Sequence, residues 1–351
     1  MKAVIMAGGE GTRLRPLTLT RPKPFVAIGG RPVVEYVLDS LKNAGVRDVI
    51  LTTAYKPEVL LGHLRGGSQL GVNLVYSLED TPMGTAGGVK KIAPYLDSTF
   101  IVASGDGFAR VDIKRLVEFH KKSGAMATLG LTRVENPSEF GIVGTDENGR
   151  ITRFKEKPKA EEAFSNLINT GIYVLEPEVL KHVPEGQAFD FGKQLFPLLV
   201  EKGLPVFGHE LEGLWIDVGR PSDLLTASAR LCEESASGNL VHAGAKVNRD
   251  ARLTLTTLHE GASVAAAAQL DRVIVMDNAT VGAEAVLENV IVGVGARVGA
   301  RCHLRDCVLG DGAQVAEGVS LTGEKVDPGV VVSEGKGSAQ DAGRVVAGRN
   351  R

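Results

Sequence analysis

The sequence predicts an α/β domain with a mixed, mostly parallel sheet, followed by a left-handed parallel β-helix. Three observations support this prediction. Up to about residue 235, short apolar runs alternate with helical patterns, which is the rhythm of parallel α/β sheets. A small polar stretch at residues 233–238 then interrupts the pattern. After residue 240, apolar residues recur every six positions, as they do in a parallel β-helix.

The first domain can be followed element by element. Glycine-rich or charged loops end several of the apolar runs, and Asn148-Gly149 is the signal of a type I′ hairpin turn. The predicted strands are residues 2–7, 48–55, 72–78, 99–103, 127–134, 141–146, 150–154 and 169–175. The predicted helices are residues 32–43, 57–65, a short one through 90–92 after a glycine-rich loop at 81–88, 190–202, and one that starts near 221. This alternation predicts a Rossmann-like sheet, whose ligands bind at the carboxyl ends of the strands.

In the second domain the apolar pattern repeats at a constant interval, which is one residue shorter than three hexads. Three apolar positions, six apart, form each coil, and the missing residue falls at the third corner. The inward positions are Leu258, Val264 and Leu270, then Val275, Val281 and Leu287, then Val292, Val298 and Leu304, then Leu309, Val315 and Leu321. We expect domains at 1–235 and 240–332, with about five coils over 241–325 and a loose tail at 333–351.

Further apolar residues in the β-helix lie beside the inward positions. They are Ile274, Val290, Ile291 and Val308. We expect some of them to face outward or lie at corners, as an apolar patch that a monomer rarely exposes. This predicts a homo-oligomer that assembles through the β-helix.

Composition excludes several classes of protein. The net charge of −2 over 351 residues gives no reason to expect a nucleic acid or an anionic membrane as partner. Three cysteines without a C-x-x-C spacing fit a reduced compartment better than a disulfide framework. No apolar run approaches the length of a membrane-spanning helix. The first residues read as a strand without the charged and apolar regions of a leader, so we expect none. We therefore expect a soluble, cytoplasmic protein.

The loop after the first predicted strand has the composition of a phosphate-binding site. Residues 7–24 read AGGEGTRLRPLTLTRPKP, so three glycines leave the backbone N–H groups accessible to an anion. The sequence is neither a Walker A loop nor the G-x-G-x-x-G dinucleotide motif. The cations that follow are Arg13, Arg15, Arg21 and Lys23. The stretch therefore predicts a polyphosphate cradle.

Two aspartates stand at the ends of apolar runs and beside glycine. They are Asp106 in VASGDG and Asp217 in WIDVG. Mg²⁺ is held in proteins by one or two carboxylates together with phosphate and water oxygens, so the pair is a candidate metal site. Taken singly, each aspartate is equally typical of an ordinary turn or a helix cap.

The string GGEGTRLRPLT followed by PKP resembles the signature of the sugar-1-phosphate nucleotidyltransferases, and the resemblance extends over essentially the whole chain. It implies transfer of a nucleoside monophosphate from an NTP to a sugar 1-phosphate, giving NDP-sugar and pyrophosphate. It also implies site residues. The nucleotide-binding set is Ala7, Gly8, Gly9, Gly11, Thr12, Arg13, Gly84 and Thr85; the catalytic set is Arg13, Lys23 and Asp106; and the Mg²⁺ ligands are Asp106 and Asp217.

The same resemblance implies a sugar-phosphate site. The motifs E-K-P and N-x-G occur as Glu156-Lys157-Pro158 and Asn169-Thr170-Gly171. Lys157 would contact the phosphate, Glu156 and Asn169 the ring hydroxyls, and the backbone of Gly141 would face the sugar. Without the family pattern, the context of Lys157 is typical of a solvated charge and that of Asn169 of a turn residue. Ser104 is a departure, because many relatives have Asn or Leu before the Gly-Asp pair; we expect little effect.

The motif order is most similar to the mannose-1-phosphate guanylyltransferase branch, which favours GTP as the donor. Glucose-1-phosphate thymidylyl-, uridylyl- and adenylyltransferases share most of these motifs and stay open as alternatives. A less favoured alternative is acyl transfer by the β-helix, with His259 or His303 as the base. Another is a non-catalytic regulatory homologue, although such a protein would not need both metal aspartates.

Overall fold

The computed structural model describes residues 1–333 of the 351-residue chain, so the predicted loose tail lies outside the described residues except for Ser333. The chain divides into two compact units. The first unit is Met1–Gly9 with Val33–Asp217, and the second is Glu10–Pro32 with Val218 onward. The predicted boundary near residue 235 stays a prediction. The contacts group two earlier segments, 10–32 and 218–235, with the residues after 240.

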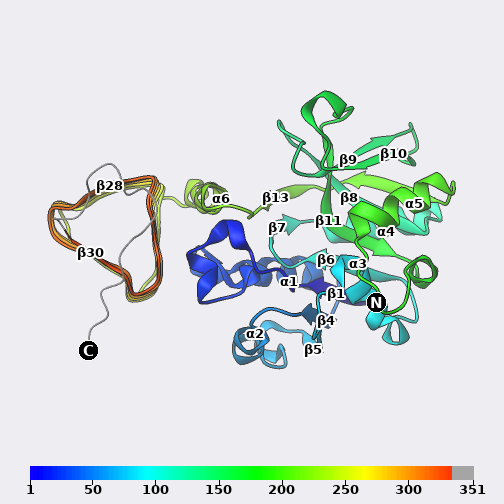
Figure 1. The fold of residues 1–351 in the computed structure, drawn as a ribbon, viewed down its shortest axis with the longest axis horizontal. Helices are drawn as coiled ribbons and strands as arrows, with labels where there is room; N and C mark the ends of the chain where they lie inside the picture. The colour runs from blue at the N-terminus through cyan, green and yellow to red at the C-terminus, as the bar shows by residue number, and fades with distance from the viewer. Residues whose placement is uncertain (334–351) are drawn as a thin grey trace. The chain divides into compact units, whose positions relative to one another are not determined.

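The first unit is built on a mixed sheet (Figure 1) with the strand order β10-β9-β11-β6-β1-β4-β5, to which β8 and β12 are added through β11. The strands are β1 Lys2–Met6, β4 Asp48–Thr53, β5 Asn73–Leu78, β6 Phe100–Ser104, β8 Ala127–Arg133, β9 Gly141–Thr145, β10 Ile151–Glu156, β11 Leu167–Leu175 and β12 Val206–Glu210. This arrangement confirms the predicted mixed α/β sheet.

β1 lies at a topological switch point. It pairs in parallel with β4 on one side and with β6 on the other, because the chain builds β4 and β5 outward and then returns across β1. In open α/β sheets the loops at such a point diverge and leave a crevice at the carboxyl ends of the strands. The loops after β1 and β6 are therefore where a ligand is expected.

Helices α1 Val33–Asn43, α2 Pro57–Leu64, α3 Gly84–Lys91, α4 Ile113–Ser123 and α5 Phe196–Glu201 accompany the sheet, and a π-helical turn, Phe191–Leu195, leads into α5. The core on one face joins Val4 and Val102 of the sheet to Val89 of α3 and Phe196 of α5. A separate two-stranded ribbon pairs β7 (Gly107–Val111) with β13 (Gly213–Asp217). Of these elements, β7, α4 and β12 were not predicted from the sequence.

Two local predictions were wrong. The stretch 84–88 is not a loop, since α3 begins at Gly84. A β-carbon on Gly87 would lie 2.8 Å from the carbonyl oxygen of Gln187, so glycine serves close packing of this helix. The second error concerns the β9–β10 hairpin. Only Gly149 has a positive φ there, 80°, whereas a type I′ turn needs positive φ at both central residues.

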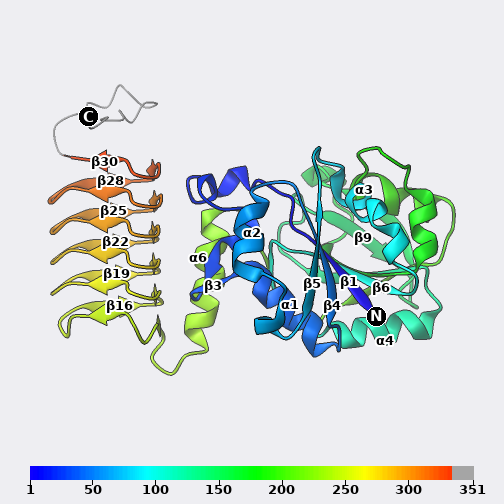
Figure 2. The same ribbon diagram turned by 90° about the horizontal axis from the view of Figure 1, so that it is seen from below.

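The second unit contains the predicted β-helix. Figure 1 looks along the stack, where the coils superimpose as a rounded triangle, and Figure 2 shows β16, β19, β22, β25 and β28 one above another. Each strand pairs in parallel with the equivalent strand of the next coil, as Leu258 does with Val275. The three sheets are β14-β17-β20-β23-β26-β29, β15-β18-β21-β24-β27-β30 and β16-β19-β22-β25-β28. The predicted inward residues, from Leu258 to Leu309 and Val315, form its buried core.

The strands of the β-helix are short. They are β14 Leu240–Val241, β15 Lys246–Val247, β16 Arg252–Thr254, β17 Thr257–Leu258, β18 Ser263–Val264, β19 Gln269–Asp271, β20 Ile274–Val275, β21 Thr280–Val281, β22 Val286–Glu288, β23 Ile291–Val292, β24 Arg297–Val298, β25 His303–Arg305, β26 Val308–Leu309, β27 Gln314–Val315, β28 Ser320–Thr322, β29 Lys325–Val326 and β30 Val331–Val332.

The third corner explains why a coil is one residue short of three hexads. Only residues 255 and 256 separate β16 from β17, whereas residues 248–251 separate β15 from β16. The tight corner requires a left-handed backbone conformation at one position of every coil. The φ values there are 45° at Leu255, 52° at Arg272, 53° at Asn289, 53° at Asp306 and 72° at Gly323. Such conformations are uncommon outside glycine and asparagine, so the fold imposes them here.

The expected apolar patch on the β-helix is absent from the described part of the chain. Ile274, Val290 and Ile291 have no exposed surface, and Val308 is only 5% exposed. Helix α6 (Pro221–Glu233) packs on β17 and on β2 (Ala27–Ile28), which pairs with β3 (Arg31–Pro32). Segments of the second unit therefore contribute to covering this face within a single chain. Oligomerisation through the β-helix stays a prediction, without the support of these side chains.

In the described part of the chain, no helix is both long enough and apolar enough to cross a membrane. The cysteines Cys232, Cys302 and Cys307 are free and buried. A reduced cytoplasmic setting stays a prediction.

Candidate active site

The loop after β1 carries the first residues of the predicted nucleotide site. The N–H group of Ala7 donates to the carbonyl oxygen of Thr52, 2.8 Å away, and so continues the β1–β4 pairing by one residue. Gly8 is half-buried, and a β-carbon there would make an ordinary van der Waals contact, 3.6 Å from the backbone nitrogen of Ala54. Gly9 is exposed, and a β-carbon there would meet no described atom within 4 Å. The loop therefore presents open backbone at Gly9.

Asp106 follows β6 at the neighbouring strand end. Gly105 permits this, because its N–H donates to the carbonyl oxygen of Met6 at 2.9 Å. A β-carbon on Gly105 would lie 2.8 Å from Cγ2 of Ile5. The turn thus lies directly against the end of β1. The half-buried carboxylate of Asp106 accepts a hydrogen bond from the hydroxyl of Ser104, so the serine side chain orients the aspartate.

Asp217 is brought to the same place by the β7–β13 ribbon. In the antiparallel register Asp217 stands opposite Gly107, the residue next to Asp106. A β-carbon on Gly107 would lie 3.3 Å from the indole nitrogen of Trp215, so the ribbon is tightly packed. The structure therefore places the two predicted metal aspartates on adjacent backbone positions, both half-buried.

The signature segment, residues 10–32, belongs to the second unit. It holds its own residues together. Gly11 has a φ of 65°, and a β-carbon there would lie 2.8 Å from Cβ of Lys23, which is buried. The hydroxyl of Thr18 donates to the carbonyl oxygen of Gly11 at 2.9 Å. Thr12 and Arg13 follow Gly11 in a short 3₁₀ turn, Thr12–Leu14. The predicted residues Gly11 and Lys23 are therefore in contact.

The predicted sugar-side residues also gather in one place. Glu156, at the end of β10, is paired in register with Gly141 of β9. β-Carbons on Gly141 and Gly192 would lie 2.7 and 2.5 Å from its carboxylate oxygen Oε2. Burial raises the pKa of Glu156, against the opposing influence of the cations of Lys157 and Lys193. Lys157 has a φ of 44° and an exposed side chain.

Asn169 lies within β11, with its side chain fixed at both ends. Its amide Nδ2 donates to the hydroxyl of Tyr173 at 3.0 Å, and its Oδ1 accepts the N–H of Gly171 at 3.0 Å. Tyr173 packs against Phe191 and Phe196, and burial raises the pKa of its phenol. Asn169 is therefore a firmly held strand residue, not the turn residue that its sequence context also allowed.

Asp190 is a candidate site residue that reasoning from the sequence missed. Its Oδ1 accepts hydrogen bonds from the N–H and the hydroxyl of Thr85, at 3.1 and 3.2 Å. The same hydroxyl accepts the N–H of Phe191 at 2.9 Å. The carboxylate of Asp190 also lies near enough to Glu156 to oppose its ionisation. Asp190 thus connects the start of α3, which carries the predicted nucleotide-binding residues Gly84 and Thr85, with the sugar-side residues. The signal in the sequence was an acidic residue between two aromatics, FDF.

The histidines proposed for the acyl-transfer alternative differ in setting. His259 is 1% exposed, and its Nε2 accepts the N–H of Gly30 at 3.1 Å. His303 is exposed on β25. A general base must reach its substrate, so the setting of His259 does not favour that chemistry.

The nucleotidyl transferase family model matches residues 2–234, and a model described as the GMPPB C-terminal domain matches residues 236–340. The chain belongs to the nucleotidyl transferase family. The first match includes every predicted site residue from Ala7 to Asp217, and the second includes the described coils of the β-helix.

Relatives in this family are similar over the same region. A UTP–glucose-1-phosphate uridylyltransferase of Synechocystis is 41% identical over 237 residues, which cover 64% of this chain and 61% of that protein. A mannose-1-phosphate guanyltransferase of Saccharomyces cerevisiae is 42% identical, over 65% of this chain and 64% of the relative. The match thus spans less than two thirds of either relative. A mannose-1-phosphate guanylyltransferase of Mycobacterium tuberculosis is 38% identical, over 72% of each chain.

A solved structure has the same fold as the matched region. It is a putative glucose-1-phosphate thymidylyltransferase of Bacillus anthracis in complex with a sucrose, 26% identical, with a TM-score of 0.60. The match covers 66% of this chain and 94% of that one.

The aspartates suit the divalent metal that nucleotidyl transferases use. In residues 1–333 there is no group of three or more His, Cys, Asp or Glu side chains that could hold a metal ion. Asp106 and Asp217 offer two carboxylates on adjacent backbone positions. Mg²⁺ typically takes one or two protein carboxylates and completes its shell with phosphate and water, so the donor set of this family member fits such an ion.

Proposed function

We propose that this chain transfers a nucleoside monophosphate from GTP to mannose 1-phosphate, giving GDP-mannose and pyrophosphate. The observation that supports it most is the meeting of Ala7–Gly9, Asp106 and Asp217 at the switch point of a nucleotidyl transferase sheet. The names of the yeast and mycobacterial relatives support GTP and mannose 1-phosphate as the substrate pair.

On the nucleotide side, the backbone of Gly8 and Gly9 binds the β- and γ-phosphates together with the guanidinium of Arg13. Lys23 stabilises the charge that builds on the transferred phosphoryl group. Such preorganised cations and N–H groups lower the barrier because they need little reorganisation during the reaction. Gly84 and Thr85 face the nucleobase and ribose, and Asp190 holds this first turn of α3 through its bonds to Thr85.

On the acceptor side, Lys157 binds the phosphate of the sugar 1-phosphate as a point charge. Glu156 and Asn169 hydrogen-bond to the ring hydroxyls, and Gly141 lets the sugar approach the backbone. The phosphate oxygen of the acceptor then attacks the α-phosphorus in line, a P–O bond to it forms, and pyrophosphate leaves. Mg²⁺ held by Asp106 and Asp217 would neutralise phosphate charge when bound.

The alternative donor and acceptor are UTP and glucose 1-phosphate. The observation that favours this pair is the 41% identity with the uridylyltransferase of Synechocystis. The fold and the proposed phosphate contacts are the same for both pairs, so only the base and the sugar distinguish them.

The test is a panel of GTP, ATP, UTP, CTP and dTTP against mannose, glucose and glucosamine 1-phosphates, read as pyrophosphate release with Mg²⁺ present. We expect the highest kcat/KM for GTP with mannose 1-phosphate. A preference for UTP with glucose 1-phosphate would replace the proposed pair by the alternative. No pyrophosphate from any pair would refute the proposed activity.

A further inference from the structure

The signature segment is bound to the β-helix through the carboxylate of Asp311. Oδ2 of Asp311 accepts hydrogen bonds from the hydroxyl of Thr20, at 2.6 Å, and from the guanidinium of Arg21. Its Oδ1 accepts the N–H of Val294, the corresponding residue one coil earlier, at 3.0 Å. One carboxylate thus connects the corner of two coils with two consecutive residues of the segment, which stand 290 and 291 positions earlier in the chain.

The contact is shielded from solvent. The side chains of Arg21 and Asp311 are 16% and 19% exposed, whereas most ion pairs in the described residues are more exposed, such as Arg305–Glu288 at 63% and 37%. Exposed pairs contribute little because water screens them. A charge-assisted, multiply bonded and largely buried pair holds its geometry more firmly. Asp311 therefore fixes where residues 20 and 21 lie.

A second contact holds the other end of the segment. Nε2 of His259, at the end of β17, accepts the N–H of Gly30 at 3.1 Å. Because this nitrogen accepts, the neutral ring carries its proton on Nδ1, which is buried and has no hydrogen-bond partner among the described residues. The β-helix thus contacts the segment at residues 20–21 and again at residue 30.

The signature segment also contains the residues that we propose bind phosphate. Lys23 stands two residues after Arg21, and its Cβ lies against the α-carbon side of Gly11, where no side chain would fit. Thr18, two residues before Thr20, bonds to the carbonyl of Gly11. Any shift of residues 20 and 21 would therefore be transmitted to Lys23 and to the start of the phosphate-binding turn.

We propose that Asp311 is a positioning residue for the nucleotide site, so that the β-helix sets the geometry of Lys23 and Gly11. This inference rests on the proposed function of the signature segment. It assigns the β-helix an indirect part in NTP binding, through residues 20 and 21, whereas the sugar-side residues Glu156, Lys157 and Asn169 are in the first unit and do not depend on Asp311.

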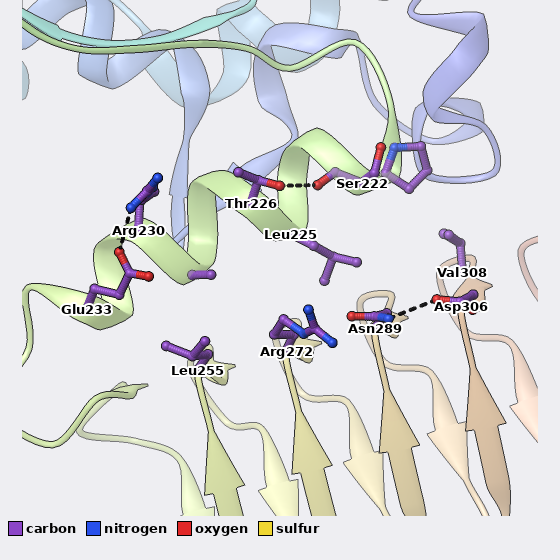
Figure 3. A pocket seen from close by; sticks show the side chains of 12 residues that line it. Ser222, Leu225, Thr226, Arg230, Glu233, Leu255, Arg272, Asn289, Asp306 and Val308 are labelled. Atoms are coloured by element: carbon purple, nitrogen blue, oxygen red, sulfur yellow. Dashed lines mark hydrogen bonds and ion pairs between the residues drawn. The ribbon is translucent and has the colours of Figure 1, made fainter. Parts of the chain in front are cut away.

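The first test compares Asp311→Asn with Asp306→Asn in the full chain. Asparagine at 311 keeps an acceptor of the same shape but loses the charge that binds Arg21. Asp306 is the matched control, because it is exposed and accepts from Asn289 within the β-helix, at 2.9 Å (Figure 3). We expect D311N to lower kcat/KM for the NTP roughly tenfold, the scale of one charged hydrogen bond. We expect the KM for the sugar 1-phosphate to stay within about twofold, and D306N to match the wild type.

Hydrogen–deuterium exchange gives a readout that is independent of activity. Peptides within residues 10–32 should exchange faster in D311N than in D306N or in the wild type, without added nucleotide. Equal exchange in all three proteins, or an equal rise of both KM values in D311N, would overturn the proposal. Should the wild type transfer no nucleotide, the proposed function would fail, and the exchange comparison would still decide whether Asp311 holds the segment.

A variant on the other side of the contact keeps the test valid if D311N does not fold. Thr20→Val removes one donor and leaves the β-helix intact, and we expect a roughly threefold loss in kcat/KM for the NTP. Because both changes remove parts of one contact, their effects in the double variant should be less than additive in free energy. Fully additive effects, or a T20V enzyme equal to the wild type in exchange and NTP kinetics, would contradict the proposal.

Discussion

A methyl group added at Gly105 should disturb the candidate active site far more than one added at Gly9. At Gly105 the new β-carbon would lie 2.8 Å from Cγ2 of Ile5 and 3.1 Å from the carbonyl oxygen of Met6. Both atoms belong to β1, which is hydrogen-bonded on both sides. The turn after β6 must therefore move, and Asp106 moves with it.

The size of the effect follows from the crowding. Overpacking in a core that cannot yield costs about 1–3 kcal/mol, which for a chain of 351 residues lowers Tm by roughly 1–4 °C. Misplacing a reacting group by about 1 Å can cost up to about 10²-fold in rate, so G105A should lose roughly tenfold or more in kcat. At Gly9 no described atom lies within 4 Å of a β-carbon, so G9A should keep the wild-type Tm and raise the KM for the NTP instead.

Thermal unfolding by scanning fluorimetry and pyrophosphate release would measure both effects on the same preparations. A G105A protein with wild-type Tm and kcat would show that the β6 turn relaxes at no cost, and would refute the reasoning. A lower Tm for G9A would show that the loop after β1 is packed, and so not open to a ligand.

Three further predictions concern single groups. Asp106→Asn and Asp217→Asn should each cut turnover roughly 10²-fold or more, because they remove charge and keep shape; wild-type rates at limiting Mg²⁺ would exclude the metal assignment. Lys157→Ala should raise the KM for the sugar 1-phosphate much more than that for the NTP. An equal rise in both KM values would indicate that Lys157 is an ordinary solvated charge that does not bind the acceptor. Burial lowers the pKa of His259 from 6.5 to about 4. The charges of Arg21 and His242 also lower this pKa, whereas that of Asp277 opposes the shift. Below pH 6.5 this imidazole takes up a proton in the unfolded chain but not in the folded one, so the free energy of unfolding should fall between pH 6.5 and about 4. Chemical denaturation should find a smaller fall in His259→Asn. An equal fall in the variant and the wild type would contradict a lowered pKa at His259.

The parts of the fold that repeat locally could be predicted from the sequence. The β-helix was one, because inward residues such as Leu270 and Leu287 occur in the same place of every coil and stack in register. The apolar residues beside the inward positions were wrongly expected to form an exposed patch. Ile274 and Ile291 are buried, and part of their cover comes from segments that neither the hexad nor the coil period reports. The glycines of α3 were misjudged for a related reason, since tertiary packing at Gly87 overrode their weak helix propensity.

The candidate site was predictable where one motif carries one role. Asp106 and Asp217 could be singled out because each follows an apolar run and matches a family motif, but their adjacency depends on the β7–β13 register, and β7 was not foreseen. Asp190 was missed because its partner Thr85 stands 105 residues away. Side chains whose role is to hold another segment show no local pattern, so they appear only once the fold is known.

The discontinuity of the second unit has a consequence for synthesis on the ribosome. Residues 10–32 emerge almost first, yet Asp311, the partner of Thr20 and Arg21, is added 290 and 291 residues later. At about 5–20 residues per second, that interval is roughly 15–60 s. Throughout it, the first unit can complete its sheet while the signature segment waits without its binding surface. If Asp311 positions the signature segment as proposed, the nascent chain acquires its full nucleotide site only as its last coils form, so premature termination between residues 217 and 311 would leave a complete first unit whose signature segment lacks its partner.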